Sequence, residues 1–266
     1  MVKSALVLCG GGSKGAFEVG VLKVLLQKWM PDVVIGTSVG AINGSVLLDG
    51  PNIFTNLLRL EQIWLNIRKK DFFKFNKHLL YKFHLASSFY SNSNMVRFLE
   101  SHVKARKFEQ LLLPFYVNCT RLRDGHNIFF HKGNLIAPVV ASCAAPPLLP
   151  PYEIDKEYYF DGGLGSYIGI DLLKQSHFKK IVIVSLIDNH NLEFSNNMVD
   201  ISKDSLSIIR HNLIKREIEL CRGSDVITIS PKPKIHVDLL DFSYTKELIQ
   251  SGEREARNLL RKGDLR

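Results

Sequence analysis

The sequence predicts an α/β fold, built on a mainly parallel sheet whose strands are joined by crossover helices. Three observations support this. The 266 residues are 45% hydrophobic and 23% charged, the balance of an ordinary folded domain. The first fifty residues alternate strand-like and helix-like patterns twice. Further short apolar runs follow, separated by long helical patterns, as expected when helices cover a parallel sheet.

The first two strand–helix units are the clearest part of the pattern. Ala5 to Cys9 is a short apolar run that ends at a cluster of glycines, which is typical of a buried strand. Apolar residues then recur at helical spacing from Ala16 to Trp29, and Pro31 ends that helix. Val33 to Ile35 predicts the second strand, and Ala41 to Leu48 predicts the helix that follows a glycine-bounded turn.

The rest of the chain continues the alternation less regularly. Residues 53–107 have a more helical pattern, and long helices are predicted at Met198 to Arg222 and Tyr244 to Arg261. We therefore expect one domain over residues 1–266, with a helical, basic and aromatic insertion around 53–107. The remaining predicted strands are Phe115 to Cys119, Asn127 to His131, Tyr158 to Phe160, Ile181 to Leu186 and Asp225 to Ile229.

Charge and hydropathy limit the classes of partner and location. The formal net charge is +9, which suits an anionic partner such as a phospholipid surface, a nucleic acid or a phosphorylated substrate, or serves solubility alone. No apolar stretch has the length of a membrane-spanning helix, and no secretory leader is visible. We expect a cytoplasmic protein that touches membranes peripherally, with export lacking a cleaved signal peptide as an open alternative.

The four cysteines are widely spaced, without the pairing typical of a zinc site or a disulfide framework. Cys9 and Cys119 lie inside strand-like runs, so we expect small buried hydrophobic residues in a reducing compartment. No metal and no cofactor is expected.

Gly36-Thr37-Ser38-Val39-Gly40 fits the G-x-S-x-G pattern at the point where a strand leads into a helix. This context favours a nucleophile elbow, a sharp turn that presents the serine hydroxyl, in which Gly36 and Gly40 relieve crowding. A helix start also favours developing negative charge. The alternative is that Ser38 only caps the helix.

Gly10, Gly12 and Gly15 satisfy G-x-G-x-x-G directly after the first strand, so a dinucleotide loop must be considered. Such a loop requires an acidic residue at the end of the second strand, whereas Asp32 precedes that strand. A phosphate-binding P-loop would need lysine where Ala16 stands.

A glycine-rich loop beside a serine elbow has another use, because its bare amides can form an oxyanion hole. We assign this role to the loop as a whole, with Lys14 as a cation at the mouth of the site. The six residues are Gly10, Gly11, Gly12, Ser13, Lys14 and Gly15.

Asp161-Gly162-Gly163 follows a predicted strand, and an acid held there can reach a nucleophile at the same sheet edge. By itself the pattern is more typical of an ordinary Asp-Gly turn. A histidine base would be expected after the aspartate, but none lies in a glycine-marked loop after a clear strand, apart from His190 near one strand end. The sequence therefore favours a Ser38–Asp161 dyad over a triad with a histidine base. The histidines considered for that base are His177, His190, His211 and His236.

In order along the chain, GGGSKG, GTSVG, ASCAAP (Ala141 to Pro146) and DGG resemble the motif blocks of the patatin-like phospholipase family. The resemblance implies a three-layer α/β/α sandwich, hydrolysis of lipid acyl esters without a metal, Ser38 as nucleophile, Asp161 as its partner, and the glycine block as oxyanion hole. One departure is that Tyr167-Ile168-Gly169 stands where family members often have N-x-P.

Arg68 to His84 interleaves six basic residues with five aromatic ones. This composition suits a segment that contacts anionic lipid head groups and inserts rings below them. A helix pair with its aromatic side chains in the core explains it equally well. Single-stranded nucleic acid is a weaker alternative, and no nucleic-acid partner is expected.

The sequence thus predicts a serine acyl hydrolase that acts on phospholipids or other acyl-ester lipids. Two alternatives stay open. One is a latent scaffold that binds lipid or membrane without turnover, and the other is a nucleotide-binding module that uses the glycine loop.

Overall fold

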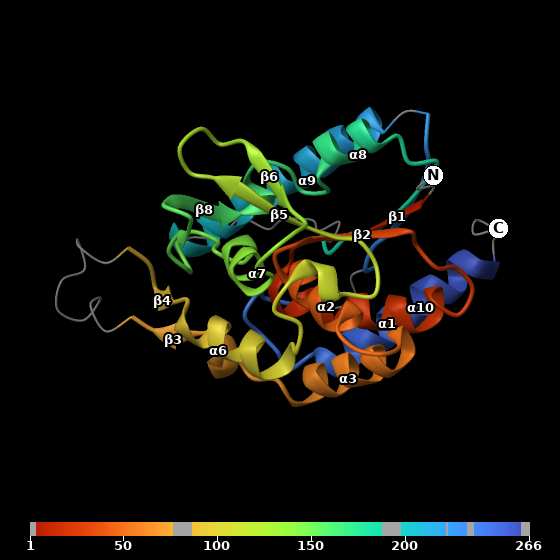
Figure 1. Ribbon diagram of the computed structural model, residues 1–266, viewed down its shortest axis with the longest axis horizontal. Helices are drawn as coiled ribbons and strands as arrows, with labels where there is room; N and C mark the ends of the chain where they lie inside the picture. Colours follow the sequence, from red (N-terminus) through yellow and green to blue (C-terminus); the bar gives the residue numbers. More distant parts are fainter. Residues whose placement is uncertain (1–3, 77–86, 188–197, 222, 233–236, 262–266) are drawn as a thin grey trace.

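The computed structural model describes residues 4–76, 87–187, 198–221, 223–232 and 237–261, apart from the side chains at 198–200 and 202–204. An eight-stranded sheet lies at its centre (Figure 1), in the order β10-β9-β1-β2-β5-β8-β7, with β6 also paired to β5. The strands are β1 (Ser4–Leu8), β2 (Val33–Thr37), β5 (Phe115–Arg121), β6 (Asn127–Phe130), β7 (Tyr152–Ile154), β8 (Glu157–Asp161), β9 (Lys180–Val184) and β10 (Asp225–Ile229).

Strands β10, β9, β1, β2 and β5 are parallel, whereas β6, β7 and β8 pair antiparallel at one side. The central strand β1 is hydrogen-bonded to both β2 and β9. Because the carboxyl ends of parallel strands meet at one edge, the turns after β1 and β2 are neighbours there. The two glycine-rich motifs of the sequence occupy these turns.

Helices cover both faces of the sheet (Figure 1). Helices α1, α2, α3 and α10 lie on one face, and α8 and α9 lie on the other. Their bounds are α1 (Gly15–Leu25), α2 (Val39–Leu48), α3 (Ile53–Asn66), α8 (Ile170–Ser176), α9 (Met198–Leu220) and α10 (Thr245–Arg261). The predicted α/β fold with a mainly parallel, helix-covered sheet is therefore confirmed.

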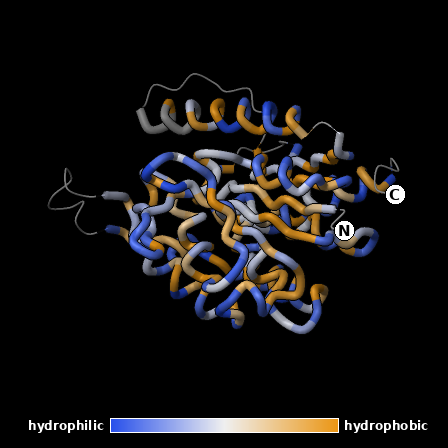
Figure 2. The backbone as a smooth tube through the Cα atoms, turned by 45° about the horizontal axis from the view of Figure 1, so that its top comes forward, coloured by the Kyte–Doolittle hydropathy of each residue, from blue (hydrophilic) through white to orange (hydrophobic). Residues whose placement is uncertain are grey.

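The hydrophobic core is divided by the sheet. Alternate residues of β1 point to opposite faces, so Leu6 and Leu8 join the larger cluster, whereas Ala5 and Val7 join the smaller one. All of β1 is buried, as in strands covered by helices on both faces. Figure 2 shows hydrophobic residues concentrated in the interior and hydrophilic ones along the outer loops.

The region 53–107 contains α3, α4 (Lys69–Phe72), the two-stranded sheet of β3 (Lys74–Phe75) and β4 (Tyr90–Ser91), and α6 (Ser93–His102). Its apolar side chains, such as Trp64 and Phe98, belong to the larger core cluster. Of the basic and aromatic segment, residues 77–84 lie outside the described part of the chain.

Several elements differ from the sequence prediction. Helix α1 ends at Leu25, and hydrogen-bonded turns continue the chain to Trp29. Strand β7 and the short strands β3 and β4 were not predicted. Neither was α7 (Ile136–Ser142), which contains Pro138. This proline is the third residue of the helix, where the backbone amide has no partner within a helix, so it does not interrupt the hydrogen bonding.

All four cysteines are buried, as expected. Among the described helices, none combines the length and the apolar character that crossing a bilayer requires.

Candidate active site

Ser38 lies between β2 and α2 in an unusual backbone conformation. Its φ is 55° and its ψ is −123°, a region that residues other than glycine rarely adopt. A Cβ atom at Gly40 would lie 2.1 Å from the carbonyl oxygen of Leu8, so only glycine lets α2 approach β1 this closely. The Ser38 side chain makes no capping hydrogen bond to α2. The turn therefore has the form of a nucleophile elbow, and a helix cap does not explain the serine.

Asp161 is the last residue of β8 and is only 8% exposed. Its carboxylate lies close enough to the Ser38 side chain for that hydroxyl to lower the pKa of Asp161. The amide of Gly163 donates a second bond to Asp161 Oδ1 at 2.8 Å, which fixes the carboxylate in the DGG turn. The structure thus brings the predicted pair together, with Ser38 half-buried and its partner buried.

Burial raises the pKa of Asp161 above its ordinary value. The Ser38 hydroxyl, the hydrogen bond from the Gly163 amide and the positive charge of Arg210 all oppose this rise in pKa. A carboxylate with a raised pKa is a stronger base toward a hydroxyl than an exposed aspartate. The environment of Asp161 therefore suits proton transfer.

The glycine loop after β1 lies against Ser38. A Cβ atom added to Gly10 would be 3.0 Å from Ser38 Cβ. Further along the loop, the amides are already bonded: Ser13 donates to Leu239 at 2.8 Å and Lys14 to Gly11 at 3.2 Å. The amide of Gly15 donates to the carbonyls of Gly12 and Ser13. Within the described residues, the amides of Gly10, Gly11 and Gly12 have no acceptor, so they are the candidates for an oxyanion hole.

We expected Lys14 to be a cation at the mouth of the site, but its side chain is buried. Only 9% of the residue is exposed, and it has a bonding partner. Ser13 is wholly buried, and its hydroxyl donates to the carbonyl of Asp238 at 2.8 Å. Ser13 therefore fastens the loop to the chain around 238–239 through both its hydroxyl and its amide.

The segment Ala141 to Pro146 contacts both members of the pair. Ser142 Oγ accepts the amide hydrogen of Ser38 at 2.9 Å and donates to the carbonyl of Asn118 at 2.7 Å. The amide of Asp161 donates to the carbonyl of Ala144 at 3.0 Å. Sequence reasoning gave this block no role, because its function lies in contacts with distant residues.

The loop after Asp161 contains a second set of contacts that the sequence did not reveal. The Tyr167 hydroxyl donates to the carbonyl of Gly10. Glu217 Oε2, from α9, accepts the amides of Tyr167 and Ile168, each at 3.0 Å. This is the position at which the chain departs from N-x-P.

No histidine among the described residues interacts with Ser38 or Asp161. His177 is exposed and bonds to its own helix end, and His211 lies within α9. His190 and His236 fall outside the described residues.

Asp32 bonds to Ser4 at the opposite edge of the sheet, at 2.9 Å to its amide and 2.8 Å to its hydroxyl. It is therefore far from the position that a dinucleotide loop requires.

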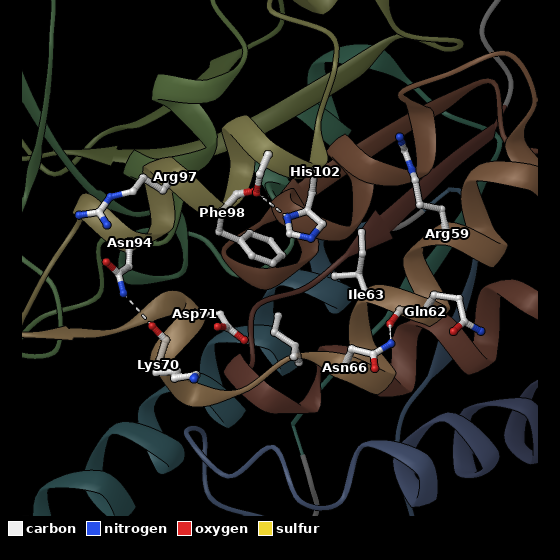
Figure 3. A pocket seen from close by; sticks show the side chains of 12 residues that line it. Arg59, Gln62, Ile63, Asn66, Lys70, Asp71, Asn94, Arg97, Phe98 and His102 are labelled. Carbon is white, nitrogen blue, oxygen red and sulfur yellow. Dashed lines mark hydrogen bonds between the residues drawn. The ribbon is translucent and has the colours of Figure 1, made fainter.

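A groove of about 630 Å³ lies between α3, α4 and α6, and its lining includes neither Ser38 nor Asp161. Figure 3 shows Arg59 and Arg97 at opposite ends of it, so the two cations do not converge on one point. Arg59 is held by an ion pair with Asp49 at 3.0 Å. Ile63 and Phe98 lie between them. The groove is separate from the candidate active site.

Comparisons with known proteins agree with this geometry. A family model described as patatin-like phospholipase matches residues 6–174. The chain is 22% identical over 283 residues to patatin-like phospholipase domain-containing protein 7 of Mus musculus, covering 96% of this chain and 20% of the relative. It is 28% identical over 175 residues to lysophospholipase nte1 of Aspergillus terreus, covering 65% of this chain and 11% of that one. It therefore spans a fifth or less of these two relatives.

The solved structure of VipD from Legionella pneumophila has a similar fold, with a TM-score of 0.52 and 13% identity over 98% of this chain and 67% of that one. The family match includes the glycine loop, the elbow, the Ala141 to Pro146 block and the DGG turn. By the match over residues 6–174 and the arrangement of these blocks, the chain belongs to the patatin-like phospholipase family.

Proposed function

We propose that this chain is a serine acyl hydrolase that cleaves fatty-acyl esters of phospholipids or related lipids. The observation that carries the proposal is that the buried Asp161 carboxylate lies beside the side chain of Ser38, whose backbone is strained. Membership of a phospholipase family and the resemblance to a lysophospholipase support the lipid class of substrate. The substrate is a neutral ester carbonyl presented beside the glycine loop.

In the first half of the proposed reaction, Ser38 Oγ attacks the ester carbonyl carbon while its proton passes to Asp161. The carbonyl oxygen becomes an oxyanion, which the amides of the glycine loop stabilise. One such donor is worth about 2.7–4 kcal/mol of barrier. When the tetrahedral intermediate collapses, the leaving alcohol takes the proton from Asp161 and the acyl group stays on Ser38.

In the second half, water attacks the acyl carbon and gives a proton to Asp161. Collapse of this intermediate releases the fatty acid, and the proton returns to Ser38. The pair then regains its starting state. Because one carboxylate takes and returns the proton in both halves, a histidine is not required.

Fatty-acid release from phosphatidylcholine and lysophosphatidylcholine vesicles, measured by mass spectrometry, tests this proposal. The native chain should release fatty acid, and Ser38→Ala and Asp161→Asn should each lower the rate by about 10³-fold or more. Asp225→Asn is the matched control, because Asp225 is exposed on β10 and its carboxylate pairs, among the described residues, with Lys180 alone at 3.4 Å. Vesicle binding without any turnover would contradict the proposal and favour a latent scaffold.

We also propose that the edge formed by β3 approaches the lipid surface. In the described part of the basic and aromatic segment, Phe72 is buried in the core, but Phe75 is 49% exposed beside the exposed Lys74. An exposed ring next to a cation suits an interface with anionic lipid. In vesicle flotation, we expect Lys74→Ser/Phe75→Ser to bind anionic vesicles less, and Leu58→Ser, on α3, to bind like the native chain. Equal binding by all three would contradict this.

A further inference from the structure

Tyr167 is buried on the face of the sheet opposite the larger core. The residue is 3% exposed and packs with the smaller hydrophobic cluster. Its hydroxyl donates a hydrogen bond to the carbonyl of Gly10, a residue 157 positions earlier in the chain. The glycine loop is therefore bonded to a buried phenol hydroxyl on the side of the smaller hydrophobic cluster.

The bond to Gly10 also fixes the direction of the next amide. A trans peptide unit is planar, with its carbonyl and its N–H on opposite sides, and the bond between Gly10 and Gly11 is trans. When Tyr167 holds the Gly10 oxygen, the N–H of Gly11 must point away from Tyr167. Among the described groups none accepts that N–H. The Gly11 amide is therefore oriented and available.

Glycine at these positions makes such external support necessary. Gly10, Gly11 and Gly12 have no side chains to restrict their backbone, and glycine loses more conformational freedom on ordering than any other residue. An unsupported loop of three glycines would sample several amide orientations. An oxyanion hole works because its donors are fixed in advance. A contact that fixes one peptide unit thus has a direct effect on catalysis.

Tyr167 is itself held by α9. Glu217 is 3% exposed, and its Oε2 atom accepts the amides of both Tyr167 and Ile168 at 3.0 Å. The Ser166 hydroxyl lies near Glu217 and lowers its pKa, and the Ser166 oxygen accepts the amides of Gly169 and Ile170 at 2.9 and 3.0 Å. One carboxylate on α9 therefore organises the loop that carries Tyr167.

We propose that Tyr167 is a positioning residue for the oxyanion hole: its hydroxyl, held in place through Glu217, fixes the Gly10–Gly11 peptide so that the Gly11 amide faces the substrate carbonyl. This inference rests on the proposed acyl-hydrolase function. It assigns a role to Tyr167, the first of the three residues that stand where family members often have N-x-P, and to α9, which lies beyond the family match.

The phenol is suited to this task because it stays protonated. Burial raises the pKa of Tyr167 well above its ordinary value, so the hydroxyl remains a donor at all physiological pH values. A carbonyl oxygen can only accept, and a neutral donor satisfies it without a charge under the loop.

The test is to compare an oxygen ester with its thionoester, in which sulfur replaces the carbonyl oxygen, in Tyr167→Phe. Sulfur accepts hydrogen bonds weakly, so a thionoester gains little from an oxyanion hole. We expect kcat/KM for the ester to fall about 10- to 100-fold. For the thionoester, kcat/KM should fall much less, so the ratio of kcat/KM for the ester to kcat/KM for the thionoester should shrink. Tyr159→Phe is the matched control, because Tyr159 is also a buried tyrosine but packs on Phe130.

Glu217→Gln provides a second variant that keeps the Tyr167 side chain. The ratio of kcat/KM for the ester to kcat/KM for the thionoester should shrink in this variant too. Thermal denaturation of each variant checks that it is folded. An equal loss for both substrates would show a merely structural role, and an unchanged ratio in the two variants would overturn the inference. If the native chain hydrolyses neither substrate, the proposed function itself fails, which is a distinct result.

Discussion

Ser142 Oγ accepts the backbone amide of Ser38 at 2.9 Å across 104 residues of sequence. The same hydroxyl donates to the carbonyl of Asn118 at 2.7 Å, so it links the elbow after β2 to the strand β5 beside it. Ser38 has a positive φ and must be held there by its surroundings. The bridge from Ser142 is one of the contacts that hold it.

Removing this bridge should weaken both the fold and the site. Ser142→Ala leaves the Ser38 amide and the Asn118 carbonyl buried without a partner, and each unsatisfied group costs about 1–3 kcal/mol. We expect urea denaturation to show a loss of that order, and kcat to fall about tenfold or more as the elbow relaxes. Ser45→Ala is the control, since the hydroxyl of buried Ser45 bonds, within the described part of the chain, only to the carbonyl of Ile42 in its own helix. Equal losses in both variants would contradict the assignment.

Arg210 should set the acidic side of the pH profile. Its positive charge lowers the pKa of Asp161, which burial raises. Asp161 must be ionised to accept the Ser38 proton, so activity should be lost as the pH falls through its pKa. Arg210→Gln removes the charge and should move the acidic limb of kcat/KM to higher pH.

The control for this shift is Arg216→Gln, which makes the same charge change at an exposed position of α9. It should leave the acidic limb in place. If both variants moved the acidic limb equally, the change in the net charge of the protein would explain the shift. If Arg210→Gln left it unmoved, Asp161 would not be the titrating base.

Glu18 should make the fold less stable as pH rises. It is fully buried, and burial raises its pKa well above the ordinary value, although Asn43 donates to it at 2.8 Å. The folded chain therefore binds the Glu18 proton more tightly than the unfolded chain. The resulting stability is complete below the unfolded pKa of about 4.3 and is lost as pH rises through the folded value.

Glu18→Gln keeps the bond from Asn43 without an ionisable group, so its melting temperature should fall less between pH 5 and 8 than that of the native chain. Glu247→Gln, at an exposed position of α10, should follow the native curve. Parallel curves for the native chain and Glu18→Gln would show that this carboxyl does not control the pH dependence.

Gly40 should tolerate no side chain. A Cβ atom there would lie 2.1 Å from the carbonyl oxygen of Leu8, which is backbone and cannot move aside cheaply. We expect Gly40→Ala to lower the free energy of unfolding by more than about 3 kcal/mol. Gly125→Ala, which has a positive φ but open space around it, should cost only about 1–2 kcal/mol. A smaller loss at Gly40 than at Gly125 would mean that α2 packs differently.

The parts of the fold that the sequence predicted are those with strong local patterns. Strands β1 and β2 differed from the prediction only at their ends, because buried parallel strands are continuous apolar runs. Strand β10, a partly buried strand at the edge of the sheet, matched its predicted bounds. Strand β7 follows two prolines and has only three residues, so no periodicity marks it. Strands β3 and β4 have two residues each and are too short for any pattern.

The residues of the candidate site also divide into those that the sequence predicted and those that it did not. Ser38, Asp161 and the glycine loop could be found because each lies in a short motif whose chemistry depends on neighbouring residues. Ser142, Tyr167 and Glu217 could not, because their roles depend on partners 24 to 157 positions away. Nothing local distinguishes a serine that bridges two backbones from any other buried serine.

The central claim is that Ser38 is an activated nucleophile, and labelling with a fluorophosphonate probe tests it most directly. Intact-mass measurement should show one adduct on the native chain, none on Ser38→Ala, and much slower labelling of Asp161→Asn. An adduct that persists in folded Ser38→Ala, or a folded native chain that stays unlabelled in the presence of anionic lipid, would contradict the account.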